Sequence, residues 1–148
     1  MEYRHIEEKW IEEKRDIYKG YTYLVLANCK HGYRCGYVQI PEGHIYYENR
    51  DFRKFNVGTE INWGLTFSGR LKNQTGWWIG FDCNHSNNGV DVRLIRQHYS
   101  KEDAEYLIEN ELFYKDYGYA PGTESVAEDC KGIIDELVEE DRVLLDKD

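Results

Sequence analysis

The sequence lacks any long hydrophobic run. None of its apolar stretches approaches the roughly 20 residues that a membrane-spanning helix needs. The first residues, MEYRHIEEKWIEEKR, are charged throughout and lack the apolar core of an export signal. We therefore expect a cytoplasmic protein with no membrane partner.

Positive charge is also scarce. The 148 residues include 19 Lys and Arg against 28 Asp and Glu, which gives a net charge of −9. A protein that binds duplex nucleic acid needs a basic face to neutralise phosphates, so this charge argues against such a partner. It leaves open a pocket that binds one small anion through a few arginines, and an acidic surface that competes for a basic protein.

Common catalytic signatures are missing as well. The chain has no P-loop, no dinucleotide-binding fingerprint and no Gly-x-Ser-x-Gly elbow. Its four cysteines are Cys29, Cys35, Cys83 and Cys130, and we read them as reduced thiols because the other features are cytoplasmic. A thiol hydrolase with Cys83 as the nucleophile stays open.

Zinc is a second alternative. The side chains that could bind it are Cys29, His31, Cys35, Cys83 and His85. Their C-x-H-x3-C and C-x-H spacings lack the C-x2-C pairs that are typical of zinc sites. We therefore assign no metal, no cofactor and no catalytic residue, and a protein that is not an enzyme is favoured.

The chain length predicts one domain, residues 1–148. Ile6, Trp10 and Ile17 fall along one helical stripe, which predicts an N-terminal helix within residues 1–20. Strand-like segments in the region 21–91 are residues 21–29, 35–40, 60–69 and 77–83. Residues 70–76 are expected to form a turn. Helices are expected within residues 100–141: one begins at a cap formed by Ser100 and Asp103, and the last has an amphipathic stripe of apolar residues from Val126 to Val138. This order predicts an α+β fold, an antiparallel sheet of about four strands with flanking N- and C-terminal helices.

Three stretches combine strands with glycines and polar groups: HGYRCGYVQIPEGH (31–44), NWGLTFSG (62–69) and GWWIGFDCNH (76–85). Glycine inside a strand costs stability, because it has no side chain to pack. The presence of glycine at positions 36, 64 and 80 therefore needs an explanation. The close approach of a backbone or a ligand is one explanation, and a β-bulge is the other.

We expect the three stretches to line one pocket. Arg34 suits a phosphate, Trp63 or Trp78 can stack on a base, and the remaining groups donate or accept hydrogen bonds. The predicted ligand-binding residues are Arg34, Tyr37, His44, Trp63, Thr66, Ser68, Trp78, Asp82, Asn84 and His85.

Residues 32–44, 64–69 and 77–85 together resemble a family of small bacteriophage and prophage proteins. Its members share R-C-G-Y-V, P-x-G-H, G-L-T-[FY]-[SA]-G and W-W-x-G-F-D-C-x-H motifs in this order, and the resemblance covers most of residues 21–140. In that family a Gly-Asp pair closely follows the last motif, whereas Ser-Asn-Asn-Gly-Val separates that motif from Asp91 here.

The resemblance implies an anti-defence protein in the cytoplasm of a bacterial host. By analogy, its function would be to sequester a small nucleotide-like immune signal in the motif-lined pocket, without chemistry. Two alternatives stay open: an acidic inhibitor that binds a host defence protein directly, as anti-CRISPR proteins do, and a thiol- or metal-dependent hydrolase that acts on a nucleotide. The amphipathic terminal helices also allow a homo-oligomer.

Overall fold

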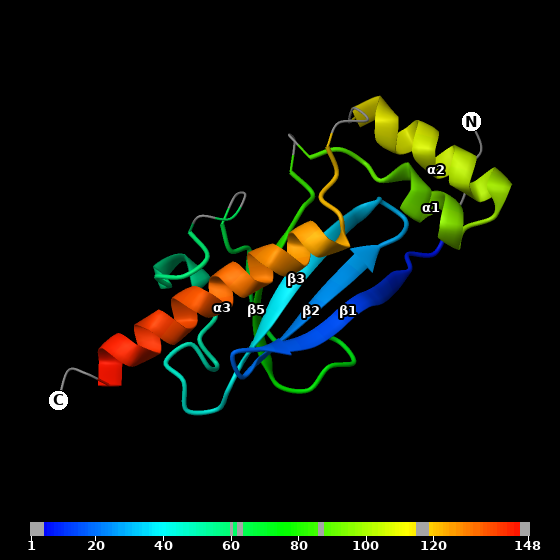
Figure 1. The fold of residues 1–148 in the computed structure, drawn as a ribbon. Helices are drawn as coiled ribbons and strands as arrows, with labels where there is room; N and C mark the ends of the chain where they lie inside the picture. Colours follow the sequence, from blue (N-terminus) through cyan, green and yellow to red (C-terminus); the bar gives the residue numbers. More distant parts are fainter. Residues whose placement is uncertain (1–4, 60, 62–63, 86–87, 115–118, 146–148) are drawn as a thin grey trace.

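The computed structural model describes residues 5–59, 61, 64–85, 88–114 and 119–145, and it shows a five-stranded antiparallel sheet with three helices (Figure 1). The strands are β1 (Trp10–Tyr18), β2 (Tyr21–Asn28), β3 (Tyr33–Ile40), β4 (Phe67–Gly69) and β5 (Trp77–Asp82), and the helices are α1 (Val92–His98), α2 (Lys101–Tyr114) and α3 (Thr123–Leu145), with a 3-10 turn η1 (Phe52–Lys54). The strand order is β1-β2-β3-β5-β4. The α+β class is confirmed, with five strands instead of about four.

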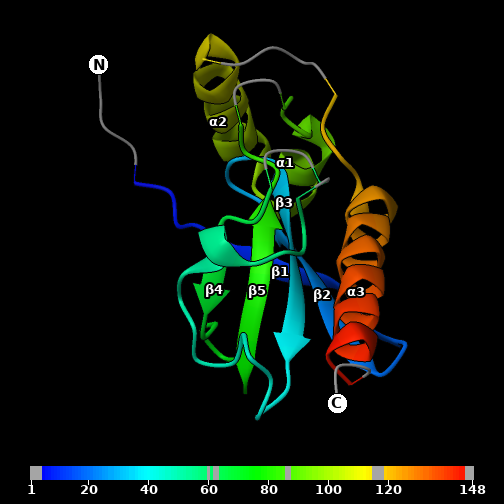
Figure 2. The same ribbon diagram turned by 90° about the vertical axis from the view of Figure 1, so that its left-hand side faces the viewer.

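Helix α3 covers one face of the sheet (Figure 2). Its apolar residues recur every three or four positions, which places them on one side of the helix. Those that are fully buried are Val126, Ala127, Cys130, Ile133, Ile134 and Leu137. They pack on alternate residues of the central strands, among them Val38, Ile79 and Phe81. The amphipathic stripe predicted for the last helix is therefore confirmed.

Helices α1 and α2 pack at the end of the sheet where β2 turns into β3 (Figure 1). The side chain of Asp91 caps α1 by accepting hydrogen bonds from the backbone N–H groups of Arg93 and Leu94. Ser100 caps α2, because its Oγ accepts from the Asp103 N–H at 3.1 Å. The start of α2 was predicted from this cap, whereas α1 was not expected. In the described part of the chain, no helix combines the length and apolar character that crossing a bilayer requires.

The N-terminal helix expected within residues 1–20 is wrong, because residues 10–18 form β1. Pairing with β2 outweighs the local helix propensity of the Glu- and Lys-rich segment. A β-bulge explains why the sequence does not alternate as a strand should: Glu12 pairs with Leu26 and Lys14 with Val25, so Glu13 is an extra residue. Ile6 precedes the strand and is buried against α1 and α2.

The expected strand at 60–69 is shorter, since β4 covers only residues 67–69, and residues 60, 62 and 63 lie outside the described residues. The other expected strands correspond to β2, β3 and β5. Side chains alternate across the sheet, so one face contacts α3 and the opposite face, which we call the open face, does not. The register places Leu26, Tyr37 and Asp82 on the open face.

Close approach explains two of the strand glycines. A Cβ on Gly36 would lie 2.6 Å from the Phe81 ring and 2.7 Å from Cys130 Sγ of α3. A Cβ on Gly80 would lie 2.3 Å from the Tyr37 ring and 2.5 Å from the Gly36 carbonyl oxygen. The third, Gly64, has φ +73, a backbone conformation that favours glycine. Neighbouring protein groups, without a ligand, are therefore sufficient to explain Gly36 and Gly80.

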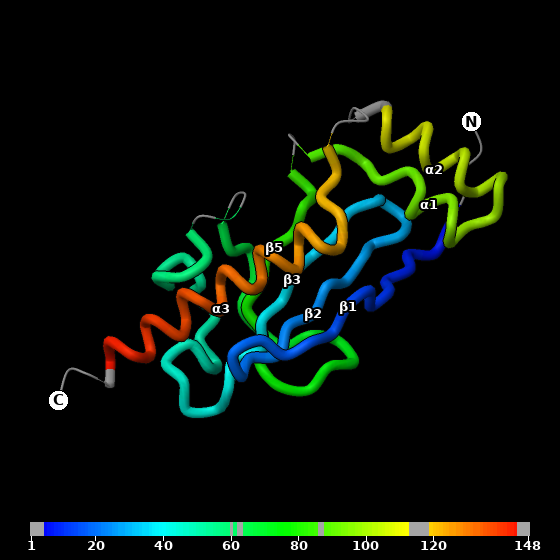
Figure 3. Tube along the Cα trace, viewed as in Figure 1, coloured from blue at the N-terminus to red at the C-terminus, as the bar shows by residue number. Residues whose placement is uncertain are grey.

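The loop of residues 70–76 connects β4 to β5 and makes a wide turn that reaches toward β1 (Figure 3). Its base is anchored, because the carbonyl of Thr75 accepts hydrogen bonds from Trp78 Nε1 at 3.0 Å and from Gln39 Nε2 at 3.2 Å. Its far side is held by Arg15 of β1, which donates to the side-chain oxygen of Gln74. The loop therefore lies over the open face at a fixed position.

Candidate functional site

The sheet divides the predicted ligand-binding residues between its two faces. Tyr37, Trp78 and Asp82 lie on the open face, as the pairing of β3 with β5 shows. Arg34 and Ser68 lie on the face that contacts α3. Trp63 lies outside the described residues. For the residues that the structure describes, the three sequence motifs therefore do not meet at a single cavity.

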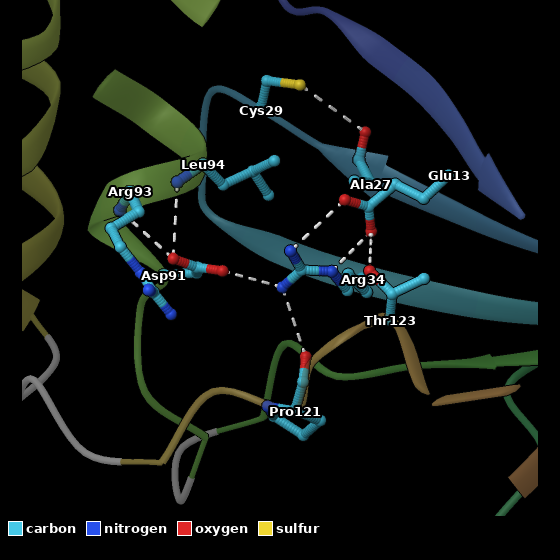
Figure 4. Close-up of polar contacts among 9 residues, drawn as sticks. All are labelled: Glu13, Ala27, Cys29, Arg34, Asp91, Arg93, Leu94, Pro121 and Thr123. Atoms are coloured by element: carbon cyan, nitrogen blue, oxygen red, sulfur yellow. Dashed lines mark hydrogen bonds and ion pairs between the residues drawn. The ribbon is translucent and has the colours of Figure 1, made fainter. Parts of the chain in front are cut away.

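Arg34 forms an ion-pair network inside the fold (Figure 4). Its Nε donates to Glu13 Oε1 at 2.5 Å, and its Nη1 donates to Asp91 Oδ2 at 2.9 Å and to the Pro121 carbonyl at 3.4 Å. The Arg34 side chain is only 8% exposed, and those of Glu13 and Asp91 are 16% and 17% exposed. Thr123 Oγ1 also donates to Glu13 Oε1 at 2.9 Å.

This network joins four elements: the bulge of β1, the start of β3, the N-terminal cap of α1 and the start of α3. Two carboxylates and a carbonyl surround one guanidinium, so the net charge there is already negative. That environment is unfavourable for a phosphate. Arg34 does line a hollow of about 520 Å³ together with Arg93, but its guanidinium is already paired with Glu13 and Asp91. The geometry therefore favours Arg34 as a structural link over a phosphate ligand.

His44 and Ser68 also have partners within the fold. His44 Nε2 lies 3.0 Å from Asp141 Oδ1, near the C-terminal end of α3. Ser68 Oγ donates to the Asn49 carbonyl at 2.6 Å and accepts from Trp77 Nε1 at 3.0 Å. Both contacts hold the segment between β3 and β4 against the rest of the protein.

Four of the predicted residues do meet, at the end of β5. Asp82 accepts a hydrogen bond from Thr66 Oγ1 at 3.3 Å and another from the Asn84 backbone N–H at 3.1 Å. His85 Nε2 lies 3.4 Å from Asp82 Oδ1. The Asp82 side chain stays 34% exposed, so it can still accept a hydrogen bond from a ligand that reaches the open face.

A cleft opens on the same open face, two strands away from Asp82. It has a volume of about 370 Å³ and lies between the sheet and the loop of residues 70–76. Its lining residues are Trp10, Leu26, Tyr37, Leu71, Lys72 and Asn73. The Trp10 indole is 45% exposed and packs edge-on against Tyr33, with ring centroids 5.9 Å apart. Tyr37 packs edge-on against Phe67 at 5.6 Å. We call this hollow the open-face cleft.

Most of the open-face cleft was not predicted. The sequence predicts a helix at Trp10, because the bulge at Glu13 interrupts the strand pattern, and it predicts only a turn at residues 70–76. Tyr37 is the one predicted ligand-binding residue in its lining. The exposed tryptophan at the start of an edge strand was the signal that could have indicated it.

The four thiols are buried. Burial raises the pKa of Cys35 and of Cys83 to about 12, and it also raises the pKa of Cys29 and of Cys130. A raised pKa keeps a thiol protonated at neutral pH, and the thiolate is the nucleophile. Cys83 therefore has the opposite of the environment that a catalytic thiol needs.

We expect the folded protein to react with fewer than about 0.2 equivalents of Ellman's reagent per chain at pH 8 within minutes, because buried thiols with raised pKa values are unreactive. In 6 M guanidinium chloride all 4 cysteines should react. The Ile45→Cys variant, at a side chain that is 57% exposed, should add about one fast equivalent in the folded state. Rapid reaction of a native thiol would contradict the buried placement.

Groups that could bind a metal ion are absent from the described residues, in which no three His, Cys, Asp or Glu side chains are arranged for this purpose. Comparison of the chain with protein-family models, with curated proteins and with solved structures found no match. The resemblance to phage proteins therefore stays a prediction from the motifs, and the site must be judged from its own geometry.

Proposed function

We propose that the protein binds and sequesters a small nucleotide-like ligand in the open-face cleft, without chemistry. The observation that carries this proposal is the presence of an exposed indole, that of Trp10, and a phenol ring, that of Tyr37, in the lining of one hollow. Aromatic faces stack on nucleobases with about 1–3 kcal/mol per base. A volume of about 370 Å³ accommodates a base with its sugar.

Polar groups near the cleft support the same ligand class. In the strand register, Asp82 of β5 lies opposite Cys35 of β3, and Cys35 lies opposite Leu26 of β2, which forms the cleft floor. Asp82 therefore lies two strands from Leu26, on the same face of the sheet. Adjacent strands are about 4.8 Å apart, which places this carboxylate about 10 Å from the floor. A ligand larger than one nucleoside could reach it with an amino or hydroxyl group.

The hydrolase alternative receives no support from the thiols. Their pKa values are raised by burial, and Cys83 packs in the core beneath α3 while Asp82 and His85 contact each other. A positioned base beside an activated thiol is the arrangement that nucleophilic catalysis needs. A binding protein is therefore the reading that fits these residues best.

A second candidate function is inhibition of a basic host protein. The C-terminal end of α3 supports it, because Val143 is 44% and Leu144 is 45% exposed there. A hollow beside them is lined by Asn56, Asp135, Glu136, Glu139, Glu140 and Val143. Apolar groups with an acidic rim are suited to a basic partner. This candidate becomes the preferred one if no nucleotide binds.

Thermal unfolding with a panel of cyclic dinucleotides and ADP-ribose derivatives tests the first proposal. A ligand present at 100 times its dissociation constant should stabilise the fold by about 2.7 kcal/mol. For a chain of this size, that corresponds to a rise in Tm of about 5–11 °C. The phage resemblance is the reason for placing these immune signals first in the panel.

The Trp10→Ala variant should weaken the binding of any such ligand about tenfold or more, because a stacking surface is lost. Each Tm shift is measured against the same variant without ligand, and equilibrium dialysis checks the affinity. Ile45→Ala, at an exposed side chain outside the cleft, serves as the matched control and should bind normally. Unchanged affinity in Trp10→Ala would contradict the site, and recovery of an altered ligand would point to the hydrolase.

A further inference from the structure

Among the described residues that line the open-face cleft, Lys72 is the one cation. It makes no ion pair with any other residue that the structure describes. Arg15, at the margin of the same face, is already engaged, because its Nη2 lies 2.8 Å from Glu12 Oε1 and it also donates to Gln74. The ammonium of Lys72 is therefore the free charge of this site.

The backbone around Lys72 is held in place from both sides. The backbone carbonyl of Thr75 accepts hydrogen bonds from the side chains of Gln39 and Trp78. The side-chain oxygen of Gln74 accepts a hydrogen bond from Arg15. Asn73 adopts φ 64, a left-handed conformation that turns the chain sharply beside Lys72. A loop fixed in this way binds a ligand at a lower entropic cost than a mobile loop would.

The surrounding charge does not cancel this cation. Glu12, an acid at the margin of this face, is already paired with Arg15, and charges farther than about 8 Å are largely screened at physiological ionic strength. A charge pair at contact distance in a partly exposed site still attracts, because the effective dielectric there is lower than in bulk water. Lys72 is therefore the cation of the lining that an anionic ligand would meet.

We infer that the open-face cleft selects ligands that carry an anionic group beside a planar ring, and that the ammonium of Lys72 binds the anionic group. The ring contacts Trp10 and Tyr37, and the phosphate or other anion lies toward the loop of residues 70–76. This inference rests on the proposed function, and it narrows the ligand class from nucleosides and other planar compounds to nucleotides.

Two fluorescent probes with one ring system test it directly. 1-Anilinonaphthalene-8-sulfonate carries a sulfonate, and N-phenyl-1-naphthylamine is the same compound without it. We expect Lys72→Met to weaken binding of the sulfonate probe about five- to tenfold and to change that of the neutral probe by less than about twofold. Lys72→Arg should restore most of the difference. Lys54→Met, at a side chain that is 83% exposed on η1, should change neither affinity.

The outcomes separate the two proposals. If Trp10→Ala leaves the binding of both probes unchanged, the cleft is not their site and the proposed function is overturned. If Trp10→Ala weakens the binding of both probes but Lys72→Met changes the two affinities equally, the cleft is still their binding site, and the selection of anions by Lys72 is overturned. Raising the salt concentration from 50 to 500 mM should weaken only the sulfonate probe in the wild-type protein, and the same loss in Lys72→Met would also contradict the role of Lys72.

Discussion

Replacing Arg34 with Met is expected to lower the free energy of unfolding by about 3 kcal/mol or more. The substitution leaves the carboxylates of Glu13 and Asp91 largely buried without their cation, and removing one partner of a buried pair typically costs about 3–5 kcal/mol. For a chain of this size, a loss of 3 kcal/mol corresponds to a fall in Tm of about 6–12 °C. Urea unfolding followed by circular dichroism measures it.

An exposed pair provides the matched control for this result. Arg142 lies 2.5 Å from Glu139, with side chains that are 65% and 61% exposed, so Arg142→Met should cost less than about 1 kcal/mol. Neutralising both partners in an Arg34→Met, Glu13→Gln, Asp91→Asn variant should recover part of the lost stability. A single Arg34→Met variant as stable as Arg142→Met would show that the network is not a structural link.

Gly80→Ala is the second substitution for which we expect a large effect, a loss of about 2–3 kcal/mol. The added methyl would lie 2.5 Å from the Gly36 carbonyl oxygen, a backbone atom that cannot move without disturbing the pairing of β3 with β5. It would also meet the Tyr37 ring at 2.3 Å and displace the floor of the open-face cleft. Overpacking of this kind typically costs about 1–3 kcal/mol.

Gly132 allows the opposite result from the same chemical change. It lies inside α3, and nothing comes within 4 Å of a Cβ built there. Gly132→Ala should therefore stabilise the protein by about 0.5–1 kcal/mol, because alanine favours the helix. Equal stabilities of Gly80→Ala and Gly132→Ala would mean that the Tyr37 ring does not lie across Gly80. Tyr37 would then not occupy its described position in the open-face cleft.

The sequence predicts well those helices and strands that are determined by residues close together in the chain. Helix α3 has its apolar residues at helical spacing within one segment, and the cap of α2 is visible as Ser100 and Asp103. The hairpin of β2 and β3 follows from two short strands around a turn with Gly32. Each of these features is determined by residues close together in the chain.

The candidate site could be predicted only in part, because its contacts are distant in sequence. Arg34 bonds Glu13 and Asp91, which are 21 and 57 positions away, and a guanidinium with two such partners looks like a free phosphate ligand in the sequence alone. Trp10 and Lys72 share one cleft although β1 and the loop of residues 70–76 are at opposite ends of the sheet region. Only the folded topology brings these groups together.

The extra residue in β1 has a further consequence for how copies of this protein meet. A regular edge strand offers a template on which another chain can add a strand, and irregular or charged edges discourage it. The bulge at Glu13 breaks the regular spacing of the strand, and Asp16 Oδ1 accepts a hydrogen bond from the Ile17 N–H at 2.7 Å. Residues 12–16 are also all charged. Growth of the sheet across its β1 edge is therefore disfavoured, and self-association at that edge would have to use side-chain surfaces.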